Sequence, residues 1–211
     1  MMISVEEARG YYPEGDPVHG FDHVLRVLRL VERIGAAEGA DLEVLRAAAL
    51  LHDVARADEL TTGRCHAQAG AERAREILAG QPKAAAVVEA IRTHRFRDNN
   101  RPTTLEGQIL YDADKLDAIG AVGVARAYAM GGQRGQALWA PVTAAFAQRE
   151  RAAGLADLSR EGHTPVHEYV FKLSKLRDTL FTATAKALAD ERHRFMAEYY
   201  ARLEAEVKGE L

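Results

Sequence analysis

Apolar residues recur at helical spacing along most of this chain, and this periodicity restricts the fold class more than any other feature of the sequence. The segment that follows Asp16-Pro17 has its apolar residues on one helical face: Val24, Val27, Leu28, Val31 and Ile34. Alanine, the strongest helix former, is abundant. No stretch of useful length shows the alternation of apolar and polar residues that is typical of a half-buried strand. The sequence therefore predicts an all-α fold.

Capping signals indicate where several helices begin. Ser4 with Glu7 and Thr103 with Glu106 have the spacing of a capping box, and Asp41 is a typical N-cap residue. A short first helix is predicted at Ser4, and further helices cover about 17–39, 41–51, 66–78, 82–94 and 103–116. A break is expected at Gly131-Gly132, and residues 131–165 are the least regular part. Helical spacing then returns from 165 to 207, with a bend near 182–184.

The organisation predicted from this pattern is one domain over residues 1–211, with a core over about 19–130 and C-terminal helices over about 165–208 packed on it. The charge balance gives a net charge of -3, from 28 Lys and Arg against 31 Asp and Glu. Proteins that grip nucleic acid usually carry a basic excess, so no nucleic-acid partner is expected. A small anionic substrate needs only a few local cations.

Cysteine usage and hydropathy indicate a cytoplasmic protein. Cys65 is the one cysteine, so no internal disulfide can form, which fits a reducing compartment. No apolar run approaches the roughly 20 residues of a membrane span, and the first ten residues do not resemble a signal peptide. We therefore expect no membrane partner. The Ala-rich helical surfaces are compatible with a homodimer.

Three short segments combine imidazoles and carboxylates in apolar surroundings. The first is His19 to His23, whose two histidines are four residues apart and would share a helical face. The second is His52-Asp53, which directly follows an apolar helix, where burial of a charge is costly unless the charge is paired or bound to metal. The third, residues 111–117, holds three carboxylates and a lysine. Each segment alone has an ordinary structural explanation, but together they indicate a site.

A set of two imidazoles and two carboxylates favours one divalent metal ion of the borderline group, Mn, Fe, Co, Ni or Zn. Magnesium is less suited, because it prefers oxygen ligands and retained water. Four protein ligands on a six-coordinate ion leave positions for water and substrate. Such a metal lowers the pKa of bound water and polarises a phosphoryl oxygen.

The segments HGFDH, LLHDVAR, IRTHRF and DADKLDAIGAVGVAR resemble a branch of small, single-domain bacterial proteins in the HD-domain metal-dependent phosphohydrolase superfamily. That superfamily carries the signature H…HD…D. The C-terminal segment HEYVFKLSKLRDTLFTATAK also resembles this branch, so the resemblance extends from about His19 to Lys186. It implies an HD-domain helical bundle with a C-terminal helical extension.

The resemblance implies the metal ligands His23, His52, Asp53 and Asp114. Asp114 is preferred to Asp112 because the superfamily's ligand typically precedes a basic residue and leucine. Asp53 is also a candidate to accept the proton of the attacking water. His19 matches the start of an HDxxH segment, but Gly20 stands where that segment has Asp, so no role is assigned to His19.

Five further residues are carried over as substrate-side candidates. Lys115 would neutralise phosphate charge, and His94 would contact a phosphate or donate a proton to the leaving group. Asp117 would lie near the substrate or orient a metal ligand. Arg56 and Lys172 are candidate phosphate contacts. The ordinary alternatives are surface positions for Lys115 and Arg56 and a helix-terminal histidine at His94.

The function implied is hydrolysis of a small phosphorylated substrate, a nucleotide, with cleavage of a nucleoside triphosphate to a monophosphate and pyrophosphate. The alternatives are a nucleoside monophosphate phosphatase, a phosphodiesterase acting on a cyclic or alarmone nucleotide, a regulatory nucleotide-binding module without turnover, and a structural helical protein with an incidental metal. The remaining histidines are expected to be incidental: His66 and His193 on helix surfaces, His163 and His167 as capping or surface groups.

Overall fold

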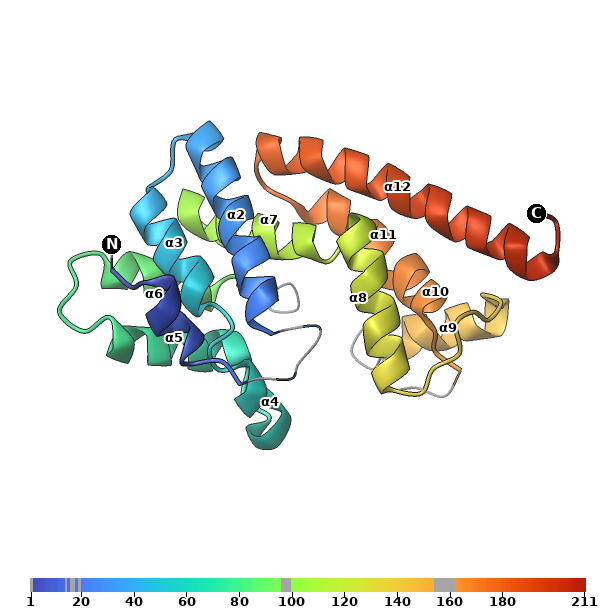
Figure 1. Ribbon diagram of the computed structural model, residues 1–211, viewed down its shortest axis with the longest axis horizontal. Coiled ribbons are helices and arrows are strands. Elements are labelled where there is room, and N and C mark those ends of the chain that lie inside the picture. Colours follow the sequence, from blue (N-terminus) through green and yellow to red (C-terminus); the bar gives the residue numbers. More distant parts are fainter. Residues whose placement is uncertain (1, 14, 16–17, 19, 96–99, 154–161) are drawn as a thin grey trace. The chain divides into compact units, whose positions relative to one another are not determined.

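The structure is a computed structural model that describes residues 2–13, 15, 18, 20–95, 100–153 and 162–211 (Figure 1). The fold is all-α, as the sequence predicts. The chain divides into two compact units, the first formed by Met1–Asp117 with Leu180–Ala185 and the second by Ala118–Thr179 with Lys186–Leu211. That the two units form one domain stays a prediction. No helix in the described part of the chain has the length and apolar character needed to cross a membrane.

The first unit is a bundle of short helices around an aliphatic core. Its elements are α1 Val5–Arg9, α2 Phe21–Glu38, α3 Leu42–Leu51, α4 Arg56–Thr62, α5 His66–Ile77, α6 Ala84–Arg92 and α7 Leu105–Asp117. α2 packs on α3 and α7, and α6 packs on α3 and α5. The apolar face predicted for α2 is buried at Val24, Val27, Val31 and Ile34. The ends of α2, α3 and α7 that carry the polar motifs therefore meet inside this bundle.

The helix starts follow the capping chemistry with one exception. The capping box of Ser4 and Glu7 is confirmed, and the Asp41 side chain accepts from the first backbone N–H groups of α3. The box predicted at Thr103 is wrong, because Thr104 caps α7 by accepting from the N–H of Gly107 at 3.1 Å. Helix α4, between the second motif and α5, is an element that the sequence pattern did not indicate.

The buried carboxylate of Asp112 attaches residues 180–185 to the rest of the first unit. Asp112 is fully buried on α7 and accepts three hydrogen bonds, from the backbone N–H groups of Phe181 and Thr182 at 2.9 and 2.8 Å and from the Thr182 hydroxyl at 2.7 Å. The helical pattern from residue 165 is therefore interrupted, rather than bent, at residues 180–182 before α12 Ala183–Lys208 begins.

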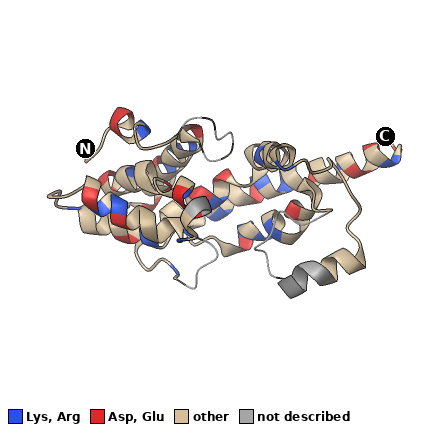
Figure 2. Cartoon of the chain, turned by 90° about the horizontal axis from the view of Figure 1, so that it is seen from below, with Lys and Arg blue, Asp and Glu red and all other residues tan. Residues whose placement is uncertain are grey.

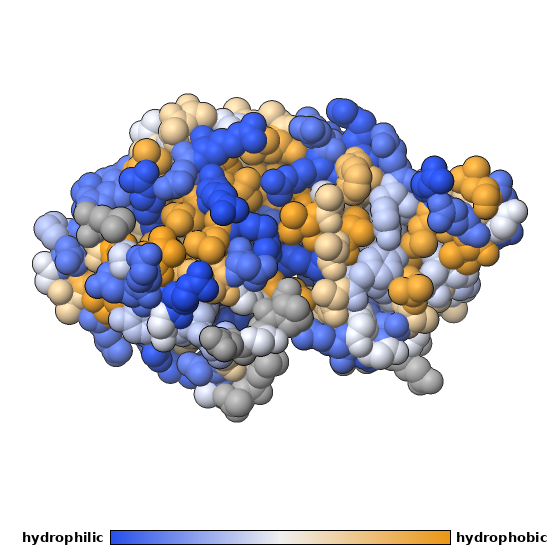
Figure 3. Space-filling model, in the orientation of Figure 1, coloured by the Kyte–Doolittle hydropathy of each residue, from blue (hydrophilic) through white to orange (hydrophobic). Residues whose placement is uncertain are grey.

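The second unit contains α8 Gly120–Gln133, α9 Ala144–Ala153, α10 Pro165–Glu168, a π-helix over Tyr169–Leu173, α11 Ser174–Leu176, a 3-10 turn over Arg177–Thr179, and most of α12. α8 continues through the predicted break at Gly131. A β-carbon at Gly131 would lie 3.1 Å from the ring of Pro165, so this glycine permits close packing instead of ending the helix. Acidic and basic residues are interspersed along the helices (Figure 2), and the face in Figure 3 mixes polar and apolar residues.

Candidate metal centre

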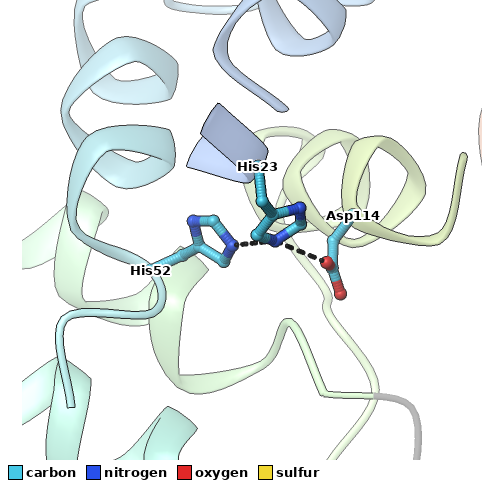
Figure 4. Close-up of side chains that lie close together, drawn as sticks. All are labelled: His23, His52 and Asp114. Carbon is cyan, nitrogen blue, oxygen red and sulfur yellow. Dashed lines mark hydrogen bonds and ion pairs between the residues drawn. The ribbon is translucent and has the colours of Figure 1, made fainter. Parts of the chain in front are cut away.

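Three motif residues from three separate segments meet inside the first unit. His23 lies on α2, His52 directly follows α3, and Asp114 lies on α7 (Figure 4). The Nε2 atoms of His23 and His52 are 3.2 Å apart, and His23 Nε2 is 3.5 Å from Asp114 Oδ1. One potential ligand atom of each residue lies within 4.8 Å of the others. This grouping brings together three of the four residues that were predicted to bind metal.

The second nitrogen of each histidine indicates what the cluster binds. His52 Nδ1 is 2.8 Å from the carbonyl oxygen of Ala49, and His23 Nδ1 is 2.7 Å from Asp117 Oδ2. A carbonyl and a carboxylate only accept, so both Nδ1 atoms carry the protons. Burial lowers the pKa of His52 to about 4, so its ring is neutral at pH 7. Its Nε2 lone pair then faces His23 Nε2 at short range, an arrangement that a cation between the two would stabilise.

Asp53, the fourth predicted ligand, lies between this trio and a second one. Its Oδ2 is 3.8 Å from the Nε2 atoms of both His23 and His52. Its Oδ1 is 3.5 Å from His66 Nε2 and 3.6 Å from His94 Nε2. Asp53, His66 and His94 form a second group with ligand atoms within 4.8 Å of one another. The two carboxylate oxygens therefore face two sets of nitrogen donors, each suited to a borderline divalent ion.

The surface position predicted for His66 is wrong. Its ring is buried at the start of α5, and burial lowers its pKa to about 4. α5 comes close because Gly70 lies against the His52 carbonyl, where a β-carbon would be only 3.2 Å from the oxygen. A sequence signal did exist: His66 is in helical register with the small residues that follow, Ala67, Gly70, Ala71 and Ala74, which form the buried face of α5.

The electrostatics favour ionised carboxylates. Burial alone would raise the pKa of Asp53, but a hydrogen bond from His94 and the charge of Arg56 hold it well below its usual range. Burial alone would also raise the pKa of Asp114, but the positive charge of the Lys115 ammonium outweighs burial and lowers this pKa. Both carboxylates therefore remain charged at neutral pH, as metal ligands must be.

The predicted substrate-side residues of the first unit lie around this cluster. Lys115 Nζ is 2.6 Å from Asp114 Oδ2 and 3.3 Å from the His94 carbonyl oxygen, so it is buried against a ligand. Arg56 Nη1 lies 2.9 Å from His66 Nδ1. His94 donates from Nδ1 to a backbone carbonyl and presents Nε2 to Asp53. Their roles toward a substrate stay predictions.

Asp117 is buried behind the cluster, with Oδ2 on His23 Nδ1 and both oxygens on the Arg26 guanidinium. Arg26 is a residue that the sequence reasoning did not select. Its signal is its position, three residues after His23 on the same helical face. Asp117 therefore contacts a ligand histidine, whatever its relation to a substrate.

Residues of the second unit are described separately. Lys172 pairs with Glu168 at 2.6 Å within that unit, and its predicted phosphate contact stays a prediction. The surface positions expected for His163 and His167 are wrong, because both rings are buried, and His167 Nδ1 lies 2.8 Å from the hydroxyl of Thr164, the N-cap residue of α10. The His167 ring stacks on Phe146 with centroids 3.8 Å apart, so aromatic packing holds it inside. His19 lies outside the described residues.

Comparisons with known proteins identify the family. Residues 20–119 match the family described as HD domain. The uncharacterized protein YpgQ of Bacillus subtilis is 33% identical over 195 residues, which are 90% of this chain and 85% of YpgQ. A crystal structure of YpgQ in complex with ADP is similar, with a TM-score of 0.73, 31% identity, and coverage of 98% of this chain and 99% of that one. A predicted HD superfamily hydrolase from an uncultured Thermotogales bacterium has a TM-score of 0.64 at 31% identity, with coverage of 96% and 90%.

Proposed function

Because the chain belongs to the HD-domain phosphohydrolase superfamily, we propose that it is a divalent-metal-dependent hydrolase of nucleotides that cleaves nucleoside triphosphates to a monophosphate and pyrophosphate. The observation that carries the metal dependence is the approach of two buried Nε2 atoms to 3.2 Å beside the Asp114 carboxylate. The four proposed ligands are His23, His52, Asp53 and Asp114. A divalent ion in such a site supplies Lewis-acid polarisation of a phosphoryl oxygen and acidifies water.

The chain's own residues supply proton transfer. Asp53 is ionised, and its Oδ1 faces away from the proposed ligand nitrogens of His23 and His52, toward the imidazoles of His66 and His94. This placement suits Asp53 to accept the proton of an attacking water. His94 has its Nδ1 proton committed to the Ile91 carbonyl at 2.5 Å, so in the imidazolium form the Nε2 proton is the one that would pass to the leaving oxygen.

Positive charge near the cluster supports an anionic substrate. Lys115 neutralises Asp114 and lies within 3.3 Å of the His94 carbonyl oxygen, and Arg56 lies beside His66. Such fixed cations stabilise the charge that develops during phosphoryl transfer. The net charge of -3 belongs to the whole chain. The electrostatic potential at the site depends instead on nearby groups such as Lys115 and Arg56. The nucleotide class is supported by the ADP complex of YpgQ.

The test is a screen of nucleoside tri-, di- and monophosphates and cyclic nucleotides against Mn²⁺, Co²⁺, Ni²⁺ and Mg²⁺, with products identified by chromatography. We expect pyrophosphate release from triphosphates, fastest with the borderline metals. Asp53→Ala should abolish metal binding and hydrolysis together. Asp178→Ala, at a position whose side chain is 79% exposed, is the matched control and should retain both. Full activity in Asp53→Ala would refute the mechanism.

The products also separate the alternatives. Release of inorganic phosphate from monophosphates would identify a phosphatase, and opening of cyclic nucleotides a phosphodiesterase. Nucleotide binding without any product under all four metals would identify a regulatory module. Loss of stability as the only effect of metal removal would identify a structural metal.

A further inference from the structure

A line of hydrogen-bonded side chains leads from the surface of the first unit to the proposed ligand His23. Arg26 donates from Nε to Asp117 Oδ1 at 2.7 Å and from Nη2 to Oδ2 at 3.1 Å. Asp117 Oδ2 in turn accepts from His23 Nδ1 at 2.7 Å. Arg26 and His23 are three residues apart on α2, and Asp117 is the last residue of α7. The Asp117 carboxylate on α7 thus binds two side chains of α2.

Asp117 requires a cationic partner because of its burial. Its side chain is 1% exposed, and a carboxylate removed from water is costly unless it is paired. The two parallel bonds from Arg26 fix the plane of the carboxylate as well as its charge, since a guanidinium presents its donors in a rigid fork. With its plane fixed, Asp117 holds the proton of His23 on Nδ1 and directs the Nε2 lone pair at His52 and Asp114.

The remaining nitrogen of the Arg26 guanidinium also has a carboxylate partner, Asp22. Arg26 Nη1 donates to Asp22 Oδ2 at 2.5 Å, so all three nitrogens of Arg26 have carboxylate partners. A phosphate on this arginine would have to displace one of those carboxylates. The Asp22 side chain is 62% exposed, so its ion pair with Arg26 contributes little. The buried pair with Asp117 is therefore the one that matters.

We propose that Arg26 is a positioning residue for the metal centre, and that it acts through Asp117 to fix the tautomer and orientation of His23. The inference rests on the proposed function only in taking His23 as a metal ligand. Partners that orient ligand histidines typically contribute 10–100-fold to metal affinity. Arg26 lies one step further out, so its contribution should be at the lower end of that range.

The experiment is calorimetric titration of the metal-free protein with Mn²⁺ alone, without nucleotide. We expect Asp117→Asn to weaken Mn²⁺ binding by about 10–100-fold and Arg26→Met by about tenfold. Asp22→Asn is the matched control, since it removes the exposed partner of the same arginine, and it should keep the wild-type affinity. Because Arg26 acts through Asp117, the double variant should bind no more weakly than Asp117→Asn alone.

A histidine ring spectrum supplies a readout that general destabilisation does not change. Long-range ¹H–¹⁵N NMR of the metal-free protein should show His23 protonated on Nδ1, and Arg26→Met should shift that population toward the other tautomer. Wild-type Mn²⁺ affinity in Arg26→Met, or additive losses in the double variant, would overturn the proposal. An increased KM for nucleotide with unchanged Mn²⁺ affinity would overturn it too, by assigning Arg26 to the substrate.

The outcomes for the two proposals are separable. Normal metal binding with no hydrolysis of any nucleotide would refute the proposed function and leave the role of Arg26 standing. Wild-type protein that binds none of Mn²⁺, Co²⁺ or Ni²⁺ would refute both.

Discussion

Asp112 and Asp114 lie two residues apart on α7. The structure predicts that the loss of Asp112 mainly affects stability and that the loss of Asp114 mainly affects metal binding. Asp112 accepts three hydrogen bonds from Phe181 and Thr182 and closes the first unit. Asp114 faces His23 at 3.5 Å. We expect Asp112→Ala to lower stability while the remaining folded protein binds Mn²⁺ normally, and Asp114→Ala to abolish Mn²⁺ binding at a smaller cost in stability.

The magnitude follows from the three bonds to Asp112. A hydrogen bond to a charged group contributes about 1.5–3 kcal/mol. Losses within one network are not additive, so removal of this partner from a buried network should cost about 3–5 kcal/mol. For a chain of this size that corresponds to a fall in Tm of roughly 10 °C. Thr182→Val removes only the hydroxyl donor at 2.7 Å and should cost about 1–2 kcal/mol.

Urea denaturation in a chelator, together with calorimetric Mn²⁺ titration of the folded protein, separates the two carboxylates. Asp112→Asn retains one acceptor oxygen and should fall between wild type and Asp112→Ala in stability. If Asp112→Ala kept its urea midpoint but lost Mn²⁺ binding, the assignment of Asp112 to structure and Asp114 to metal would be wrong.

Three further outcomes are expected. The metal-free protein should lose stability as pH falls from about 6.5 toward 4. Burial lowers the pKa of His52 and His66 to about 4 in the folded state, so in this range only the unfolded state takes up protons on them, and the loss is about 1.4 kcal/mol per pH unit per histidine. A flat stability from urea titrations at pH 7, 6 and 5 would contradict it. Tyr200→Phe should leave the free energy of unfolding unchanged or raise it, because the buried Tyr200 hydroxyl has no hydrogen-bond partner among the described residues. Tyr12→Phe should instead lower it by about 0.5–1.5 kcal/mol, because it removes a 2.9 Å hydrogen bond to the Leu50 carbonyl. Mn²⁺ at 100 times its Kd should raise the free energy of unfolding by about 2.7 kcal/mol, and a Tm unchanged by chelator would contradict a bound metal.

The sequence was informative at several places where a local pattern decides the structure, although the local signals at Thr103 and Gly131 were misleading. The apolar face of α2 and the caps Ser4 and Asp41 follow from spacing and short-range hydrogen bonds, and the structure has them. The convergence of His23, His52 and Asp114 followed from a resemblance, because no local rule says which helix ends meet in a bundle. Long-range pairing also explains the miss at His66, whose burial depends on how closely α5 approaches at Gly70.

Carboxylates were the hardest residues to assign from the sequence. Asp112, Asp114 and Asp117 are spaced so that they cannot all share one direction on α7: Asp112 binds Thr182, whereas Asp114 and Asp117 face the two ring nitrogens of His23. Their roles depend on long-range partners, since Thr182 is 70 positions from Asp112 and His23 is 94 positions from Asp117. The sequence shows only three acids in seven residues, whereas the tertiary contacts make one structural and two relevant to the metal centre.

The histidines of the site show two ways of fixing the orientation of a ring nitrogen. His52 and His94 each follow the end of a helix, and each returns its Nδ1 to a carbonyl three residues earlier, on Ala49 and Ile91. The last carbonyls of a helix lack partners within it, so this bond satisfies one of them and directs Nε2 away from the helix. His23 lies in the first turn of α2, and the carbonyl three residues earlier, on Gly20, already accepts from the His23 backbone N–H at 3.0 Å. Its Nδ1 therefore uses a carboxylate from another helix, that of Asp117 on α7. Arg26 holds this carboxylate, so the orientation of His23 depends on Arg26. His52 and His94 need no such residue, because each is oriented by a carbonyl of its own segment.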